Sequence, residues 1–495
     1  MNLAALGEEN VRTYGEFVSL VFEGRELTNV EQQRQADRLA NALRKRGIAA
    51  GDRVVVMLPN CPEVLQAYAG ILKTGAVVVP IIFLLNAEEV RHILGDSGAK
   101  LVITSPELAA KADGFPGDTV LVGGDAPGAI AWDELIAREP DAFTMVDRAD
   151  DDIAVILYTS GTTGRPKGVA LSHRNLEANA RSAASLSELD RERYNLAVLP
   201  LSHSYGLTLM NSGNILGTRG VLLRWFNPDL VLETIQTYRV QAMAGVPTMY
   251  VYLLQYPGAG NFDTSSMRAW GSGAAPLPVE IVAPFEKKFG GRLLEGYGLT
   301  EASPVVSAHR LSGVRKLGSV GQPIPGVEVR IFDDEDRDVP RDEIGEICVR
   351  GPNVMLGYYG LPDETATTLK NGWLHTGDMG RLDEDGFLFV VERKKDLIIR
   401  GGFNVYPREV EDVLYAHPKI AEAAVVGMRD PLMGEEVMAW VVPKSGVDVT
   451  PEDVIAFCQE RLAKFKCPRD VRILPSLPKS PIGKILRKEL RAMTR

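Results

Sequence analysis

The chain has little that could build a metal centre or a disulfide framework. Its 495 residues include six histidines and four cysteines, Cys61, Cys348, Cys458 and Cys467. The cysteines lie far apart and form no Cys-x-x-Cys pair, which is typical of isolated thiols in a reducing compartment. The sequence therefore predicts neither a zinc site nor a disulfide scaffold, and a histidine-built metal centre is disfavoured.

A net basic charge is absent, and long apolar runs are scarce. The net charge is −10 and the isoelectric point about 5.4, which disfavours nucleic acid as a partner. The longest apolar run, residues 76–85, is interrupted by Pro80 and is too short to span a bilayer. Glu8 and Glu9 follow the first residues closely, unlike a signal peptide. We expect a cytoplasmic enzyme, monomeric or homodimeric, without an integral membrane segment.

A Walker A loop is missing, although a different phosphate loop is present. Residues 158–168 read Tyr-Thr-Ser-Gly-Thr-Thr-Gly-Arg-Pro-Lys-Gly, and Lys167 is followed by glycine rather than Ser or Thr, which disfavours a P-loop ATPase or GTPase. The stretch follows an apolar run, 153–157, that we expect to be a buried strand. Glycines and hydroxyls there can turn several donors toward one anion, and Lys167 adds a mobile positive charge. The residues predicted to hold a polyphosphate are Thr159, Ser160, Gly161, Thr162, Thr163, Gly164 and Lys167.

Apolar runs alternate with helix-like segments over the first three hundred residues. Strands are expected at 53–58, 76–80, 100–104, 153–157, 195–200 and 240–247, and helices at 63–73 and 86–97. Strands that are apolar throughout, alternating with helices, predict parallel sheets covered on both faces. The expected fold class is therefore α/β, with a large N-terminal domain over residues 1–394.

From about residue 318 the sequence no longer alternates strand-like and helix-like segments. Strand-like runs at 327–332, 344–350 and 387–392, separated by turns, predict a β-rich subdomain over about 318–394. The charged cluster Arg393-Lys394-Lys395-Asp396 then interrupts the pattern. Beyond it, helices at 409–416 and 451–463 and strands at 423–427 and 437–443 predict a small α+β C-terminal domain, 395–495. The cluster could alternatively be a solvated turn within one domain.

Four further motifs carry polar or glycine-rich chemistry. Residues 271–276 form a small-residue turn that a flat ring could approach closely. Residues 295–301, Glu-Gly-Tyr-Gly-Leu-Thr-Glu, place an aromatic ring between glycines and then a carboxylate. Residues 376–378 put Asp378 on a turn, and residues 478–485 put Lys484 on a loop bounded by proline and glycine. Each motif alone is a weak signal.

Together and in this order the motifs resemble the adenylate-forming superfamily of acyl-CoA synthetases, aryl-CoA ligases, luciferases and peptide-synthetase adenylation domains. The resemblance runs from about residue 28 to the end of the sequence. It implies that a carboxylate attacks the α-phosphate of ATP to give acyl-AMP and pyrophosphate, after which a thiol displaces AMP. Because charge builds on the phosphoryl oxygens, the site needs cations placed in advance.

The resemblance also implies roles for individual residues. Lys484 would bridge the acid and the α-phosphate, Glu301 would hold Mg²⁺, and Thr300 would touch the α-phosphate. Asp378 and Arg393 would bind the ribose, and Tyr297 would stack on adenine. The residues expected around the nucleotide, besides the phosphate loop, are Gly273, Ala274, Ala275, Glu295, Tyr297, Gly298, Asp378 and Arg393. The small domain would swing about Lys395, bringing Gly401 and Gly402 to a tunnel for CoA.

The acid pocket is assigned by family analogy and is mostly apolar. Its expected residues are His203, Tyr205, Val246, Met249, Gly296, Pro304 and Val305. His203 is also counted, with Lys484, Glu301 and Thr300, among the catalytic residues, although a packing role for it stays open. Residues 206–211 lack the aspartate that amino-acid-activating domains usually carry there, and an apolar pocket suits a fatty or aromatic acid.

The expected activity is that of an ATP-dependent acid–CoA ligase acting on a medium- or long-chain fatty acid, with ATP, Mg²⁺ and CoA as cofactors and co-substrates. An aryl acid of the 4-coumarate or benzoate type is the alternative substrate. The alternative acceptor is an external carrier protein. A free thiol is favoured because no phosphopantetheine-attachment serine motif is visible. The presence of Lys484, Glu301, Asp378 and Arg393 disfavours a non-catalytic nucleotide-binding protein.

Overall fold

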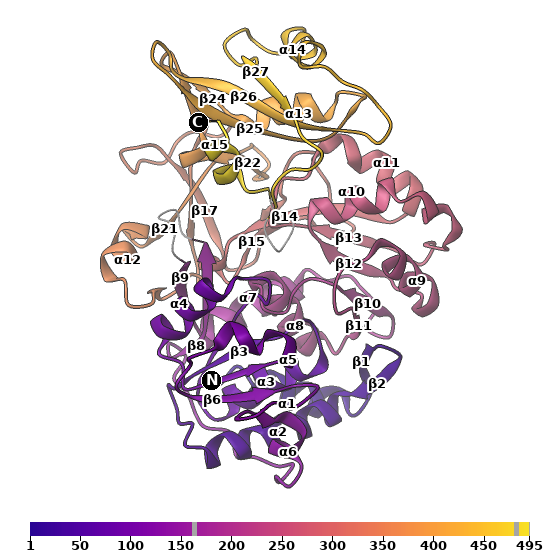
Figure 1. The fold of residues 1–495 in the computed structure, drawn as a ribbon, viewed down its shortest axis with the longest axis vertical. Coiled ribbons are helices and arrows are strands. Elements are labelled where there is room, and N and C mark those ends of the chain that lie inside the picture. Colours follow the sequence, from indigo (N-terminus) through magenta and orange to yellow (C-terminus); the bar gives the residue numbers. More distant parts are fainter. Residues whose placement is uncertain (161–165, 480–484, 495) are drawn as a thin grey trace.

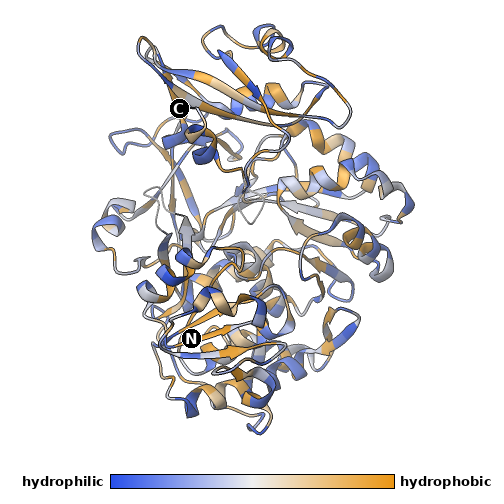
Figure 2. Cartoon of the chain, viewed as in Figure 1, coloured by the Kyte–Doolittle hydropathy of each residue, from blue (hydrophilic) through white to orange (hydrophobic). Residues whose placement is uncertain are grey.

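The computed structural model describes residues 1–160, 166–479 and 485–494. Figure 1 shows the N-terminal residues at the bottom, a second layer of sheet and helices in the middle, and the C-terminal domain at the top, in orange and yellow. The hydropathy colouring of Figure 2 shows many hydrophobic residues along the interior strands, while the outer helices carry both hydrophobic and hydrophilic residues. The described residues include no helix that combines the length and the apolar character needed to cross a membrane.

The first sheet has the strand order β19-β9-β8-β4-β3-β5-β6-β7. It is parallel from β8 to β7, while β9 and β19 are antiparallel to their neighbours. Its strands are β3 (Arg53–Met57), β4 (Val77–Pro80), β5 (Leu101–Thr104), β6 (Asp118–Leu121), β7 (Ile130–Ala131), β8 (Ile153–Ser160), β9 (Pro166–Ser172) and β19 (Gly357–Tyr358). The helices along this part of the chain are α2 (Asn29–Lys45), α3 (Pro62–Lys73), α4 (Ala87–Ser97), α5 (Pro106–Ala109), η1 (Ala110–Ala112) and α6 (Trp132–Ile136).

Helix α3 illustrates how the local sequence sets these elements. Pro62 begins the helix, where its missing N–H costs nothing. Val64, Tyr68 and Ile71 recur on one face and are buried. Gly75 follows with a φ of 78°, a left-handed conformation that turns the chain into β4. The helix thereby covers the parallel sheet with its apolar face.

The second sheet has the order β16-β15-β14-β13-β12-β10-β11-β1-β2 and is parallel from β14 to β1. Its strands are β1 (Val18–Phe22), β2 (Arg25–Thr28), β10 (Tyr194–Ala197), β11 (Arg219–Leu222), β12 (Ala242–Gly245), β13 (Ala269–Ser272), β14 (Arg292–Gly298), β15 (Val305–Ala308) and β16 (Gln322–Pro323). The accompanying helices are α1 (Ala5–Tyr14), α7 (His173–Ser185), α8 (Ser204–Leu216), α9 (Pro228–Tyr238), α10 (Pro247–Gln255), η2 (Pro257–Asn261), α11 (Val279–Phe289) and η3 (Thr300–Ala302). Because parallel strands end at one edge, the chain leaving β12, β13 and β14 meets there.

Two smaller sheets complete the chain. The antiparallel sheet comprises β17 (Glu328–Phe332), β18 (Gly345–Arg350), β20 (Leu369–Lys370), β21 (Trp373–Leu382) and β22 (Leu388–Arg393), with α12 (Pro362–Thr368) beside it. After η4 (Lys394–Asp396), the C-terminal domain has β23 (Ile398–Arg400), β24 (Phe403–Val405), α13 (Pro407–Tyr415), β25 (Ile420–Asp430), β26 (Gly434–Pro443), α14 (Pro451–Gln459), β27 (Asp470–Ile473) and α15 (Arg487–Ala492). A buried cluster that includes Ile398, Val410, Leu414, Val425 and Val437 gives this domain its own core.

The α/β fold class and the division into N-terminal and C-terminal domains are confirmed. Several boundaries differ from those expected. The strand expected at 153–157 continues to Ser160 and forms a hairpin with β9, in which Thr159 is paired with Lys167. The helix expected at 451–463 ends at Gln459. In the first case the continuation of the strand, residues 158–160, consists of hydroxyl-bearing side chains and looks like a loop in the sequence, because serine and threonine are typical of turns.

Candidate active site

The phosphate-loop lysine, Lys167, is the second residue of β9. Nζ of Lys167 is 2.5 Å from Oε2 of Glu364, a residue of the first turn of α12. It also lies 5.5 Å from the ring centroid of Tyr358. The ammonium therefore already has an anionic partner, which an incoming phosphate would have to replace. Gly161, Thr162, Thr163 and Gly164 lie outside the described residues, as does Lys484.

A buried carboxylate joins two strands of the antiparallel sheet to β14. Asp378 on β21 is the cross-strand partner of Arg393 on β22, whose Nε is 3.1 Å from Oδ1. The hydroxyl of Tyr297 donates to Oδ2 at 2.6 Å. Burial, followed by the charge of Asp378, raises the pKa of Tyr297 well above its ordinary value, so the phenol stays protonated and donates. Since each carboxylate oxygen has two lone pairs, Asp378 retains capacity to accept further hydroxyls.

Glu301 and Thr300 lie together in η3, just beyond the end of β14. Oε1 of Glu301 accepts a hydrogen bond from the hydroxyl of Tyr358 at 2.9 Å. Oγ1 of Thr300 lies 3.3 Å from Oγ of Ser204, at the start of α8. The short helix thus joins the chain leaving β14 to β19 on one side and to α8 on the other.

The residues expected to line the acid pocket gather where β12, β13 and β14 end. A Cβ on Gly273 would lie 3.2 Å from Cε1 of Tyr205, and one on Gly245 would lie 3.2 Å from Sδ of Met249. The absence of these side chains lets Tyr205 and Met249 pack directly on the backbone. Burial raises the pKa of Tyr205 to about 12. Ala274, at the same turn, has a φ of 67°, which is uncommon for a non-glycine residue.

The remaining pocket positions are mostly buried. His203 is the N-cap residue of α8, where its Nδ1 accepts from the N–H of Tyr205 at 3.2 Å. Val246 and Pro304 are buried, and Val305 is half-buried. Gly296 and Gly298 belong to β14, and a Cβ on Gly298 would lie 2.0 Å from the carbonyl oxygen of Pro304, so that position requires glycine.

Glu295 points toward the domain interface. Its Oε1 accepts from the N–H of Leu277 at 3.0 Å and lies 4.0 Å from the guanidinium of Arg408 on α13. Burial raises the pKa of Glu295 to about 7, although Arg408 acts in the opposite direction. The side chain thus contacts the C-terminal domain, and a nucleotide-binding role for this residue stays a prediction.

A group of buried charges follows Arg393 at the junction of the domains. The guanidinium of Arg487 lies 2.9 Å from Glu392, 2.7 Å from Glu411 and 3.6 Å from Asp396. Burial and then the charge of Arg393 lower the pKa of Lys395, the expected hinge residue. These ion pairs connect the last strand before the junction with α13 and α15.

The glycines expected near CoA form the turn between β23 and β24. Gly401 and Gly402 have φ values of 56° and 85°. Phe403, which follows them, is 59% exposed and packs its ring 5.0 Å from that of Phe465. The turn presents apolar surface to solvent in this arrangement of the two domains.

Two family descriptions match the sequence over most of its length. Residues 7–359 match the AMP-binding enzyme family, and residues 409–484 match the AMP-binding enzyme C-terminal domain. The chain belongs to the AMP-binding enzyme family. It is 38% identical to a long-chain-fatty-acid–CoA ligase of Bacillus subtilis, over 99% of this chain and 94% of that protein. It is also 38% identical to a feruloyl-CoA synthase of Amycolatopsis, over 94% of each chain.

Solved structures agree with this assignment. ATP-bound MatB from Rhodopseudomonas palustris is 34% identical and has a TM-score of 0.93, with 100% of this chain and 99% of that chain covered. This AMP-binding enzyme is accordingly an AMP-forming acid–CoA ligase that uses ATP and CoA. The predicted superfamily and enzyme class are confirmed.

The structure adds site residues to this AMP-binding enzyme that the sequence motifs do not reveal. Tyr358, Glu364 and Arg408 each contact a residue of a predicted motif. None of these three residues lies within a predicted motif. A single tyrosine, glutamate or arginine outside a motif does not indicate a functional site. Their partners are distant in the sequence, so folding alone reveals the contacts.

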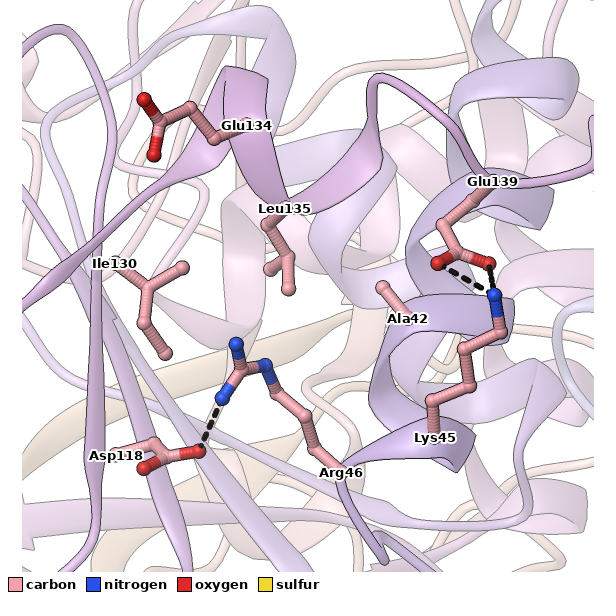
Figure 3. Close-up of a pocket in the computed structure, with 8 residues that line it drawn as sticks. All are labelled: Ala42, Lys45, Arg46, Asp118, Ile130, Glu134, Leu135 and Glu139. Atoms are coloured by element: carbon pink, nitrogen blue, oxygen red, sulfur yellow. Dashed lines mark hydrogen bonds and ion pairs between the residues drawn. The ribbon is translucent and has the colours of Figure 1, made fainter.

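A separate hollow of about 700 Å³ lies between α2, α6, β6 and β7, in the lower part of the molecule. Figure 3 shows Arg46 paired with Asp118 and Lys45 paired with Glu139 along its walls. These two pairs neutralise four of the charged side chains that line the hollow, and the fifth is the carboxylate of Glu134. The hollow contains none of the motif residues, and we assign no role to it in this AMP-binding enzyme.

Proposed function

We propose that the protein activates a medium- or long-chain fatty acid as acyl-AMP and transfers the acyl group to CoA. The observation that carries this proposal is the composition of the expected acid pocket. Tyr205 and Met249 pack against the glycines at the ends of β13 and β12, and Val246, which follows β12, is buried. A substrate chain without charge suits such a lining, because burying an unpaired charge costs several kcal/mol.

Magnesium fits the site as the partner of ATP. Among residues 1–160, 166–479 and 485–494, no group of three His, Cys, Asp or Glu side chains could hold a metal ion alone. Mg²⁺ commonly binds through one or two carboxylates together with substrate phosphates and waters. Glu301, close to the strand that carries Lys167, supplies such a carboxylate. Bound there, the cation would neutralise charge on the phosphates during adenylation.

The same proposal assigns the other residues their tasks. Asp378 and Arg393 hold the ribose, Tyr297 stacks on adenine, and Lys167 with the rest of the phosphate loop binds the β- and γ-phosphates. Lys484 joins the acid and the α-phosphate. The C-terminal domain, which we place at 395–495, then turns about Lys395 and brings the Gly401–Gly402 turn to the thiol. The exposed Phe403 beside this turn supports a second docking position for that surface.

AMP release from ATP, measured with and without CoA, tests the substrate assignment. The panel consists of straight-chain acids of increasing length together with benzoic and 4-coumaric acids. We expect CoA-dependent release that is greatest with medium or long chains. A maximum with an aromatic acid would instead support the second candidate, which the feruloyl-CoA synthase relative favours. Release only with an added acyl carrier protein would contradict CoA as the acceptor.

Lys484→Ala tests the assignment of the two half-reactions. We expect this variant to lose acyl-AMP formation almost completely, while thioester formation from supplied acyl-AMP is much less affected. The physical reason is that the lysine charge is needed where the α-phosphoryl group transfers, and not where the thiol attacks. Equal loss of both half-reactions would contradict this role.

A further inference from the structure

Tyr358 contacts both a predicted phosphate residue and the predicted magnesium residue. Its hydroxyl donates to Oε1 of Glu301 at 2.9 Å. The ammonium of Lys167 lies 5.5 Å from the centroid of its ring, within the range of a cation–π contact. One side chain on β19 therefore links the strand that carries the phosphate-loop lysine to the carboxylate of η3.

The segment that carries Tyr358 is itself firmly attached. The N–H of Tyr358 donates to Oγ1 of Thr365 at 2.8 Å, and Tyr358 is the cross-strand partner of Val169 on β9. Three residues earlier, the N–H of Met355 donates to the carbonyl oxygen of Glu301 at 2.9 Å. The segment thus holds Glu301 at both its backbone and its carboxylate.

Such attachment matters because η3 offers Glu301 little support of its own. This helix has three residues, Thr300–Ala302, and its C-cap residue Ser303 has a φ of 67°. A 3₁₀ turn has poorer hydrogen-bond geometry than an α-helix, and one of three residues makes few internal bonds. Contacts from the neighbouring segment, including the hydrogen bond to the carboxylate, therefore help to fix Glu301.

We propose that Tyr358 is a positioning residue for the ATP–Mg²⁺ site, fixing the carboxylate of Glu301 through its hydroxyl. This inference rests on the proposed function, in which Glu301 binds Mg²⁺. A hydrogen-bonded carboxylate loses less conformational freedom when a cation arrives, so the cation binds more tightly. Removal of an outer contact of this kind typically lowers metal affinity by about tenfold or more.

Calorimetric titration with α,β-methylene-ATP, without acid or CoA, tests the proposal in the absence of turnover. Each variant is titrated once with magnesium chloride and once with EDTA, and the ratio of the two affinities is the measured quantity. We expect Tyr358→Phe to lower this ratio by about tenfold, with the affinity in EDTA unchanged. An unaltered ratio would overturn the proposal.

Tyr359→Phe is the matched control. Tyr359 is adjacent in the sequence but packs against a different hydrophobic cluster, which includes Val55 and Ile156. Tyr358 packs against the cluster that includes Val169 and Val306. Loss of the Tyr359 hydroxyl should leave the magnesium ratio at its native value. A similar loss in both variants would mean that the effect is general, and the proposal would be wrong.

Glu301→Gln separates this inference from the proposed function. If this variant keeps the native ratio, the magnesium role of Glu301 fails, irrespective of Tyr358. If Glu301→Gln lowers the ratio of the two affinities, the double variant Glu301→Gln/Tyr358→Phe tests whether Tyr358 acts through Glu301. Because Tyr358 acts through Glu301, the second substitution should add nothing in this background. A further loss of the same size would show that the tyrosine acts independently, contrary to the proposal.

Discussion

Replacement of Glu295 by glutamine should stabilise the protein increasingly as the pH rises. Burial raises the pKa of Glu295 from the ordinary value of 4.5 to about 7. Because the pKa is higher in the folded protein than in the unfolded chain, the carboxyl group makes its full contribution to stability below pH 4.5. This contribution is lost as the pH rises from 4.5 toward 7. Glutamine retains an oxygen that can accept from the N–H of Leu277. It carries no proton that could be lost.

The size of the effect follows from the two pKa values. At about 1.4 kcal/mol for each pKa unit, native Glu295 lowers the free energy of unfolding by about 1.4 kcal/mol at pH 5.5 and about 3.3 kcal/mol at pH 8, relative to its protonated form. The stability of Glu295→Gln relative to the native protein should therefore increase by about 2 kcal/mol over this interval. The attraction between the carboxylate and Arg408 is already contained in the pKa of about 7, so it adds no separate cost.

Urea unfolding followed by tryptophan fluorescence at pH 5.5 and pH 8 measures this difference. Glu233→Gln serves as the control, since Glu233 is exposed on α9 and its substitution should give the same difference at both values. If the stability of Glu295→Gln relative to the native protein does not change between pH 5.5 and pH 8, the carboxylate is not desolvated, and the reasoning is refuted.

Three other substitutions test the polar contacts of the site. Glu364→Gln should raise ATP affinity by up to about fivefold in calorimetry, because Lys167 no longer leaves a partly exposed ion pair; a weaker affinity would show that Glu364 orients the lysine. Arg487→Met should lower the free energy of unfolding by about 3 kcal/mol, since Glu392 and Glu411 lose their cation; an unchanged urea midpoint would contradict this. Asp378→Asn should raise the KM for ATP by about tenfold or more, because the amide donates where the carboxylate accepts; a native KM would exclude the ribose role.

The parallel sheets could be predicted because their strands are buried on both faces. Val77–Pro80 is apolar throughout and Arg53–Met57 is apolar after its first residue, a pattern that solvent-exposed segments do not show. Strands β15, β16 and β19 could not be predicted. The last two contain two residues each, and their pairing partners lie elsewhere in the chain. Such strands exist because a neighbouring edge offers hydrogen bonds, and not because of local sequence.

The candidate site also has residues that the sequence predicts and contacts that it does not. Tyr297, Glu301 and Asp378 stand in motifs whose residue types suggest contact with a nucleotide. The hydrogen bond between Tyr358 and Glu301 joins residues 57 positions apart, and that between Arg487 and Glu392 joins residues 95 apart. No periodicity connects residues at such separations. The supporting contacts therefore depend on topology, which places β19 beside β9 and α15 against the domain junction.

The contacts between the two domains have a character that suits the proposed rotation. Arg408 of α13 reaches Glu295 at 4.0 Å and donates to the carbonyl of Val390 at 3.0 Å, and Lys479 donates to the hydroxyl of Tyr252 at 2.9 Å. These groups are polar, so water can replace each partner when the interface opens, at a net cost of only about 1 kcal/mol for each hydrogen bond. An apolar interface of similar extent would resist separation, because opening it would expose hydrocarbon to water. The aromatic ring of Phe403 is exposed, and under the proposed rotation it would be an apolar surface for the second position to cover. If the proposed rotation takes place, the loss of polar contacts in one position and the burial of apolar surface in the other would keep the difference in free energy between the two positions small.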